Sequence, residues 1–116
     1  MNLDTLRAIL LQKPATTEGL PFGPGVLVFK VKGKMFALVP DEEPAPSISL
    51  KCDPDEALFL RDMYAAVNPG YHLNKRHWNT VTLDDSVPEP ELLRMIDDSY
   101  RLVVKGLKKA DREGLL

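Results

Sequence analysis

Apolar residues recur along the chain at two spacings, one typical of helices and the other typical of strands. A first helix is predicted at the N-terminus, because Leu3, Leu6 and Leu10 repeat at helical spacing before Pro14 interrupts the pattern. Two further stripes predict a second helix that runs to about residue 67 and a last helix that starts between residues 88 and 90. These stripes are Ala57, Leu60, Tyr64 and Val67 in the second helix, and Leu92, Ile96, Tyr100, Val103 and Leu107 in the last.

The start of the second helix carries the clearest local signal in the sequence. Asp53 can act as the N-cap, Pro54 suits the first helical position, and Glu56 completes the pattern of a capping box. The stretch NPG at residues 68–70 is expected to stop this helix.

The segment VLVFKVKGKMFALV, from Val26 to Val39, predicts two strands joined around Gly33. A two-residue turn at Lys32 and Gly33 would give the hairpin one apolar face and a basic tip. Lys-Gly is not among the favoured turn pairs, so another register stays open. With this turn, the facing pairs are Phe29 with Phe36 and Leu27 with Leu38.

Three shorter segments complete the expected sheet. Residues 47–51 alternate as a strand, residues 71–73 suggest a short strand, and residues 79–83 suggest a firmer one. Residues 41–46 are expected to form a solvated loop, and Phe22 is expected to tuck beneath the sheet. The order of elements predicts an α+β fold, an antiparallel sheet with helices packed on one face, in a single domain spanning residues 1–116.

Composition narrows the classes of protein that fit. The 116 residues carry a formal net charge of −2, so any binding of nucleic acid must rest on a local basic patch. One Cys excludes an internal disulfide, which fits a reducing compartment. No apolar run is long enough to span a membrane, and the N-terminal residues lack the pattern of a signal peptide. The prediction is a cytoplasmic protein that does not contact a membrane.

Candidate residues for catalysis or metal binding are few. His72, His77 and Cys52 show no zinc-site spacing. Cys52 precedes a helix N-terminus, but Asp53 beside it opposes a thiolate, and packing is the simpler role. Ser99 is expected to bond a backbone carbonyl rather than to attack a substrate. The prediction is therefore no enzyme, no metal site and no cofactor. One acidic cluster stays open as a metal-binding alternative: Asp84, Asp85, Glu89 and Glu91.

Basic side chains gather in two places, the hairpin tip and the segment from Tyr71 to Leu83. The simpler interpretation is that lysines protect strand edges while Trp78 anchors the core. The alternative is a basic surface in two parts that contacts the phosphates of a nucleic acid. If the nucleic acid is single-stranded, its bases could also stack on an aromatic ring. The candidate nucleic-acid contacts are Lys30, Lys32, Lys34, Lys51, Lys75, Arg76 and His77.

Five segments follow one another along nearly the whole chain: PATTEGLPFG, VFKVKGKMFAL, SLKCDP, YHLNKRHWNTV and DDSY. Together they resemble the MmcQ/YjbR family of small bacterial proteins. The resemblance implies a CyaY-like α+β fold related in shape to frataxin, a DNA-binding role of the "double wing" type, and no established catalytic residue. The positions that match the family motifs are Lys34, Lys51, Asn74, Lys75, His77, Trp78 and Asn79. The resemblance is compatible with a structural role for these residues.

The leading hypothesis is a non-enzymatic DNA-binding module. The first alternative is a protein-interaction or chaperone-like adaptor, which predicts an exposed apolar patch that includes Phe22, Met35 or Trp78. The second alternative is a frataxin-like metal binder, which requires the acidic cluster to converge.

Overall fold

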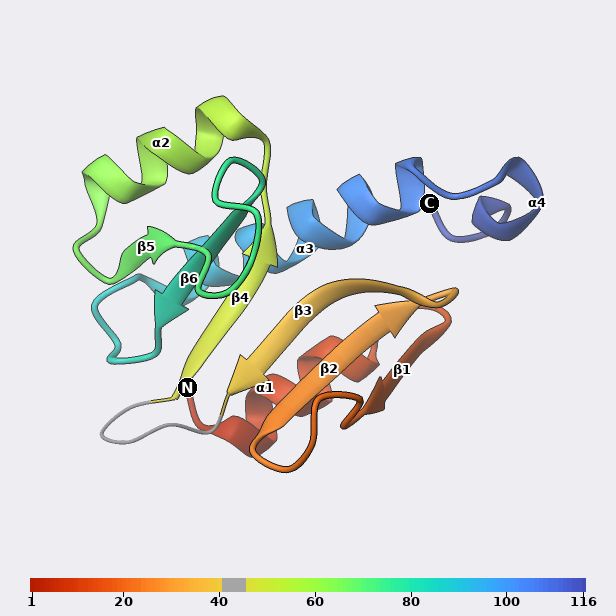
Figure 1. Ribbon diagram of the computed structural model, residues 1–116, viewed down its shortest axis with the longest axis horizontal. Helices are drawn as coiled ribbons and strands as arrows, with labels where there is room; N and C mark the ends of the chain where they lie inside the picture. The colour runs from red at the N-terminus through yellow and green to blue at the C-terminus, as the bar shows by residue number, and fades with distance from the viewer. Residues whose placement is uncertain (41–45) are drawn as a thin grey trace.

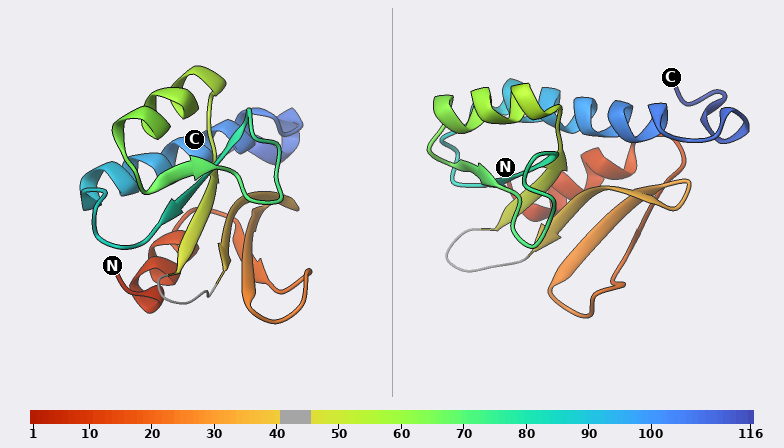
Figure 2. Two further views of the ribbon diagram at one scale, coloured as in Figure 1. Left: turned by 60° about the vertical axis from the view of Figure 1, so that its left-hand side comes forward. Right: turned by 45° about the horizontal axis from the view of Figure 1, so that its top comes forward.

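Three helices cover one face of a six-stranded antiparallel sheet, and the other face of the sheet is left uncovered (Figures 1 and 2). The computed structural model describes residues 1–40 and 46–116. The strand order is β1-β2-β3-β4-β6-β5. The elements are α1 (Leu3–Leu11), β1 (Thr16–Gly19), β2 (Val26–Val31), β3 (Lys34–Pro40), β4 (Ser47–Lys51), α2 (Pro54–Met63), β5 (Val67–Pro69), β6 (Trp78–Thr82), α3 (Glu89–Lys105) and α4 (Lys109–Arg112).

The predicted fold class is confirmed, since the sheet is antiparallel and α1, α2 and α3 pack on the same face of it. Alternation along the strands sends one set of side chains into the core. Ile48, Leu50 and Val81 are buried there against the apolar stripe of α3 and against Leu6 and Leu10 of α1. The residues between them in the strands face the uncovered side.

The hairpin of β2 and β3 has the predicted turn but not the predicted pairs. Lys32 and Gly33 both adopt positive φ, 51° and 82°, in a two-residue turn. A bulge then shifts the register, so Phe29 pairs with Ala37 and not with Phe36. Leu27 likewise pairs with Val39, and the predicted partner Leu38 pairs with Val28 instead.

The bulge places two consecutive side chains in the core. Phe36 has no cross-strand partner, and both Phe36 and Ala37 are fully buried. A regular strand would send one of the two to the uncovered face. The Phe36 carbonyl is bonded by a side chain of α3, the hydroxyl of Ser99.

Ser99 of α3 joins β3 to β4 at this bulge. The two strands pair at only two positions, Ala37 with Leu50 and Leu38 with Ser49, and they diverge toward the hairpin tip (Figure 1). The Ser99 hydroxyl donates to the Phe36 carbonyl at 2.6 Å and accepts from the Lys51 N–H at 2.9 Å. Its side chain thus replaces a ladder hydrogen bond between the strands and fixes α3 on the sheet.

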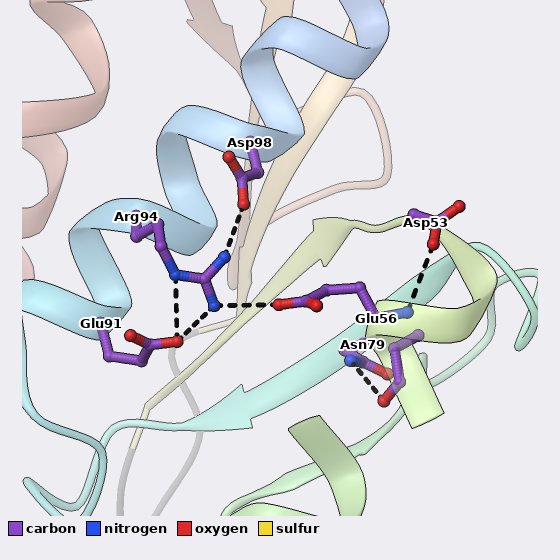
Figure 3. A network of polar contacts seen from close by, with 7 residues as sticks. Asp53, Glu56, Asn79, Glu91, Arg94 and Asp98 are labelled. Carbon is purple, nitrogen blue, oxygen red and sulfur yellow. Dashed lines mark hydrogen bonds and ion pairs between the residues drawn. The ribbon is translucent and has the colours of Figure 1, made fainter. Parts of the chain in front are cut away.

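The helices α2 and α3 are linked by the guanidinium of Arg94 (Figure 3). It bonds Asp98 and Glu91 on its own helix and Glu56 on α2. The carboxylates of Glu91 and Glu56 raise the pKa of Arg94, and Arg94 lowers the pKa of Glu91. Asp53 caps the Glu56 N–H at 3.3 Å, but the Glu56 carboxylate is bonded to Arg94, so only half of the predicted capping box forms.

Other differences from the predicted elements occur at boundaries. α2 ends at Met63, and Val67 is buried as the first residue of β5 rather than as the end of a helix. The predicted short strand at 71–73 is therefore wrong, because β5 lies just before it. β1 and α4 were not predicted, and residues 41–45 of the predicted loop lie outside the described residues.

We expect Ser99→Ala to destabilise the fold by about 2 to 6 kcal/mol, because a buried carbonyl and a partly buried N–H lose their partner at about 1 to 3 kcal/mol each. Urea unfolding followed by circular dichroism measures this change. Thr5→Ala removes a hydroxyl from an exposed position of α1 and should change stability by less than about 0.5 kcal/mol. Equal stabilities of the two variants would contradict the bridging role of Ser99.

Candidate functional site

The uncovered face of the sheet is hollowed into a groove with a volume of about 700 Å³. Its floor joins an apolar half from β2 and β3 to a hydroxyl-bearing half from β4 and β6. Its rim is formed by Phe22 on one side and by residues 68–73 on the other. The floor residues are Val26, Leu38, Pro40, Ser47, Ser49, Thr80 and Thr82.

The hydroxyls of the floor are held in place by the fold. Ser49 Oγ and Thr80 Oγ1 lie 2.7 Å apart on neighbouring strands. Thr80 Oγ1 also accepts the main-chain N–H of Tyr71 at 3.0 Å, which fixes the rim segment against β6. A ligand in the groove thus meets ordered polar groups beside an apolar surface.

Aromatic rings stand on the rim of the groove. Phe22 is 64% exposed and Tyr71 is 65% exposed. The prediction that Phe22 tucks beneath the sheet is wrong, because its loop lies over the face that no helix covers. The Tyr71 and His72 rings pack together with centroids 4.0 Å apart, and His72 has a φ of 59°. Left-handed backbone is uncommon for a residue other than glycine and is frequent at functional sites.

Two of the predicted basic contacts lie on the same face as the groove. Lys30 follows Val28 by two residues on β2, and Lys51 follows Ser49 by two residues on β4, so both alternate onto the uncovered side. Lys51 is paired with Trp78 of β6 in the register. The structure therefore brings Lys51 and Trp78 together at one end of the groove face.

The remaining basic residues lie at two separate places. Lys32 and Lys34 are exposed at the hairpin tip, and Lys75 and Arg76 are exposed in the loop between β5 and β6. Figures 1 and 2 show the tip and this loop apart from each other. The predicted basic surface is thus divided between the hairpin tip and this loop, and in strand order only Lys51 of β4 lies between them.

The basic side chains that form ion pairs in the described part of the chain are Arg7, Lys13 and Arg94, which lie on or beside the helices. Among the residues the structure describes, no ion pair forms with Lys30, Lys32, Lys34, Lys51 or Arg76. The groove face and the hairpin tip therefore carry basic groups without an ion-pair partner among the described carboxylates. The same holds at the end of α3 and on α4, for Arg101, Lys105, Lys108, Lys109 and Arg112.

The motif HLNKRHWN forms a turn that α2 anchors. Asn79 is buried on the core side, where its Oδ1 accepts from Arg61 Nε at 2.7 Å and its Nδ2 donates to the Ala57 carbonyl at 3.3 Å. The Arg61 guanidinium also donates to the carbonyls of Lys75 and Trp78. Arg61 thus holds both ends of the turn.

Other motif residues stabilise the turn from within. Asn74 Oδ1 accepts the Arg76 N–H at 2.9 Å, and Lys75 Nζ donates to the Gly70 carbonyl at 2.9 Å. A Cβ at Gly70 would lie 2.7 Å from the Cβ of Trp78, so only glycine fits. These contacts support the structural interpretation of the motif. Phosphate contacts by Lys75, Arg76 and His77 stay predictions.

Sequence reasoning missed several residues of the groove and its support. Arg61 gave no signal, because an arginine on a helix is commonly solvated. Tyr71 was assigned to a strand and not to a rim. The alternation of hydroxyls at Ser47 and Ser49, and again at Thr80 and Thr82, is the pattern that indicates one polar sheet face.

Cys52 is buried, and burial, together with the nearby carboxylates of Glu56 and Asp53, raises the pKa of its thiol to about 11. At neutral pH the thiol is protonated, so it is a packing residue beside α2 and α3.

The acidic cluster does not converge. Asp84 accepts the N–H and hydroxyl of Ser86, Asp85 pairs with the N-terminal ammonium at 2.9 Å, and Glu91 pairs with Arg94. Within residues 1–40 and 46–116, no group of three or more His, Cys, Asp or Glu is placed to hold a metal ion. The requirement of the metal-binding alternative is not met in this part of the chain. None of the described helices has the length and apolar character needed to cross a membrane.

Comparisons with known proteins agree with the family resemblance. The family model YjbR matches residues 11–102. Protein YbdF of Escherichia coli O157:H7 is 39% identical over 110 residues, covering 95% of this chain and 90% of its own. Protein YjbR of Escherichia coli K12 is 34% identical over 116 residues, covering 100% of this chain and 98% of its own. Both relatives are described as uncharacterized.

Solved structures show the same fold. A crystal structure of a Deinococcus radiodurans protein with the domain DUF419 superposes with a TM-score of 0.91 at 42% identity, over 98% of this chain and 87% of that one. A crystal structure from Pseudomonas syringae superposes with a TM-score of 0.77 at 28% identity, over 88% of this chain and 98% of that one.

We expect Arg61→Met to destabilise the protein by about 2 kcal/mol, because buried Asn79 and two carbonyls lose a charged donor. Amide exchange in residues 70–78 should also accelerate, since the turn loses its anchor on α2. Arg101→Met, at an exposed position of α3, is the matched control and should change neither quantity. Unchanged exchange in the turn of the Arg61 variant would contradict the anchoring role.

We expect alkylation of Cys52 by iodoacetamide to follow a titration with its midpoint near pH 11 in the folded protein. Because the raised pKa leaves little thiolate at pH 7.5, the reaction there should be about a hundredfold slower than in the urea-unfolded chain, where the thiol titrates near its ordinary value of about 8.5. A folded-state midpoint below the ordinary value would show an activated thiol instead.

Proposed function

The chain belongs to the YjbR family, and we propose that it is a non-enzymatic, cytoplasmic DNA-binding module. One observation carries the proposal: the basic groups of the hairpin tip and the groove face are not neutralised by the described carboxylates. In a protein whose formal net charge is −2, such a local excess is the feature expected of a phosphate-binding surface.

The contacts would be made with phosphates more than with base edges. Lys32 and Lys34 stand at an exposed tip, which can approach a backbone from several directions. Lys30 and Lys51 lie further back on the uncovered face. A small number of lysines gives weak binding that falls steeply with salt, since each neutralised phosphate releases counterions.

A second candidate function, a protein-interaction module, is favoured by exposed apolar side chains. Leu58, Phe59 and Met63 on the outer side of α2 are each more than half exposed, and so is Phe22. Exposed apolar patches commonly mark contacts with other proteins. Of the residues named for this alternative, Phe22 is exposed, whereas Met35 and Trp78 are half-buried. The protein-interaction function would become the leading hypothesis if no nucleic acid binds at low salt.

We expect labelled double-stranded DNA to bind with a log–log salt slope of about −3.6 for roughly four neutralised phosphates. Fluorescence anisotropy measures this slope with nucleic-acid-free protein at salt concentrations of about 50 and about 200 mM, a range over which binding is sensitive to salt. The double variant Lys32→Gln and Lys34→Gln should reduce the slope by about 1.8, since two contacts are lost.

The charge-matched control for this experiment is Lys105→Gln with Lys109→Gln, at exposed positions of α3 and α4. It has the same net charge as the tip variant and should retain the slope of the unmodified protein. An equal loss in both variants would show that only net charge matters. Absence of saturable binding at low salt would remove the proposed function.

A further inference from the structure

We propose that the groove on the uncovered sheet face holds unpaired bases, which makes the protein selective for single-stranded nucleic acid. This inference rests on the proposed function, because it assigns the strand form that the same basic surface binds. The argument comes from the charge, the aromatic rim and the polar floor of the groove.

The described lining of the groove is uncharged and lysines lie beyond it, which suits the uncharged bases and charged phosphates of a single-stranded nucleic acid. The groove itself is lined by no Asp, Glu, Lys or Arg among the described residues. Lys30 and Lys51 continue the same face of β2 and β4 beyond it. A strand lying along this face would place phosphates at the lysines and uncharged bases in the groove. A duplex keeps the faces of its bases stacked inside and presents phosphates and base edges, so no base face is available to stack on the rim.

The aromatic rim offers surfaces on which bases can stack. Tyr71 and His72 already pack together, so ordering these rings on binding costs little conformational entropy. Phe22 stands on the opposite side of the groove, in the loop between β1 and β2. Stacking on exposed rings is the usual source of affinity for single strands, and it tolerates any base sequence.

The floor supplies hydrogen-bonding groups at the depth of a base edge. The floor hydroxyls come from Ser47, Ser49, Thr80 and Thr82, and hydroxyls discriminate weakly between bases. Ser49 and Thr80 are bonded to each other, so a base edge would meet chiefly the hydroxyls of Ser47 and Thr82. Val26 and Leu38 form the apolar half beside them. The volume of about 700 Å³ lies within the range of roughly 300 to 1,000 Å³ found for sites that bury small organic groups.

An extended apolar peptide would fill the same groove by using Phe22 and Leu38, but it would leave the two lysines of this face without a role. The unpaired charge beside the groove therefore favours an anionic polymer over a peptide. Trp78 gives this site a spectroscopic reporter, since it is the only Trp of the chain and lies opposite Lys51.

The test compares a labelled oligothymidine of about 12 nucleotides with a duplex of equal length, within the range of single-strand site sizes. Anisotropy gives the dissociation constants, and Trp78 fluorescence reports whether the groove face is occupied. We expect tighter binding of the single strand, with quenching of Trp78. Tyr71→Ser should weaken single-strand binding about tenfold and leave duplex binding unchanged.

The controls keep failure of the inference distinct from failure of the proposed function. Leu58→Ser removes an equally exposed apolar side chain from α2, outside the groove, and should change neither affinity. Equal affinity for both strand forms, with no effect of Tyr71→Ser, would overturn the inference and leave DNA binding intact. Absence of binding to either form would overturn both. Displacement of the oligonucleotide by an uncharged extended peptide, with affinity equal to the single strand, would assign the groove to a peptide and also overturn the inference.

Discussion

The arrangement of the sheet depends on the hydroxyl of Ser99. The bulge at Phe36 turns two side chains into the core, and the Phe36 carbonyl is bonded by a side chain of α3. The Ser99 hydroxyl donates to that carbonyl and accepts from the N–H of Lys51, at the point where β3 and β4 diverge. A buried main-chain pair without this bridge would cost several kcal/mol. The bridge therefore fixes α3 to both β3 and β4 on one face of the sheet. The divergence of these two strands shapes the opposite face.

The same arrangement of strands decides which side chains lie on the uncovered face. Strand alternation gives the core side Ile48, Leu50 and Val81, and it gives the other side the hydroxyls of β4 and β6. No helix covers those hydroxyls, so they form the floor of the groove. The turn anchored by Arg61 and Asn79 then places Tyr71 and His72 on the rim. The motif that is most specific in sequence thus acts mainly by shaping the wall of the groove.

Periodicity in the sequence predicted the three long helices, the hairpin and the fold class, because each is set by local spacing of apolar residues. The bulge at Phe36 could not be predicted, since its stabilising partner lies on α3, 63 residues away. The strand β5 was missed because Asn68, Pro69 and Gly70 look like a helix stop. The lysines of the hairpin tip could be predicted as exposed, but the groove arises from β2, β3, β4 and β6 together, and no local pattern contains it.

The central claim is that the uncovered sheet face is the functional surface. Its most direct test is an amide NMR titration of the labelled protein with single-stranded DNA at low salt. The account predicts shift changes at Lys30, Ser49, Lys51 and Thr80, at Lys32 and Lys34 of the hairpin tip and in residues 70–78, with α2 and the outer side of α3 unchanged. Changes confined to the helices, or changes spread evenly over all exposed lysines, would contradict it.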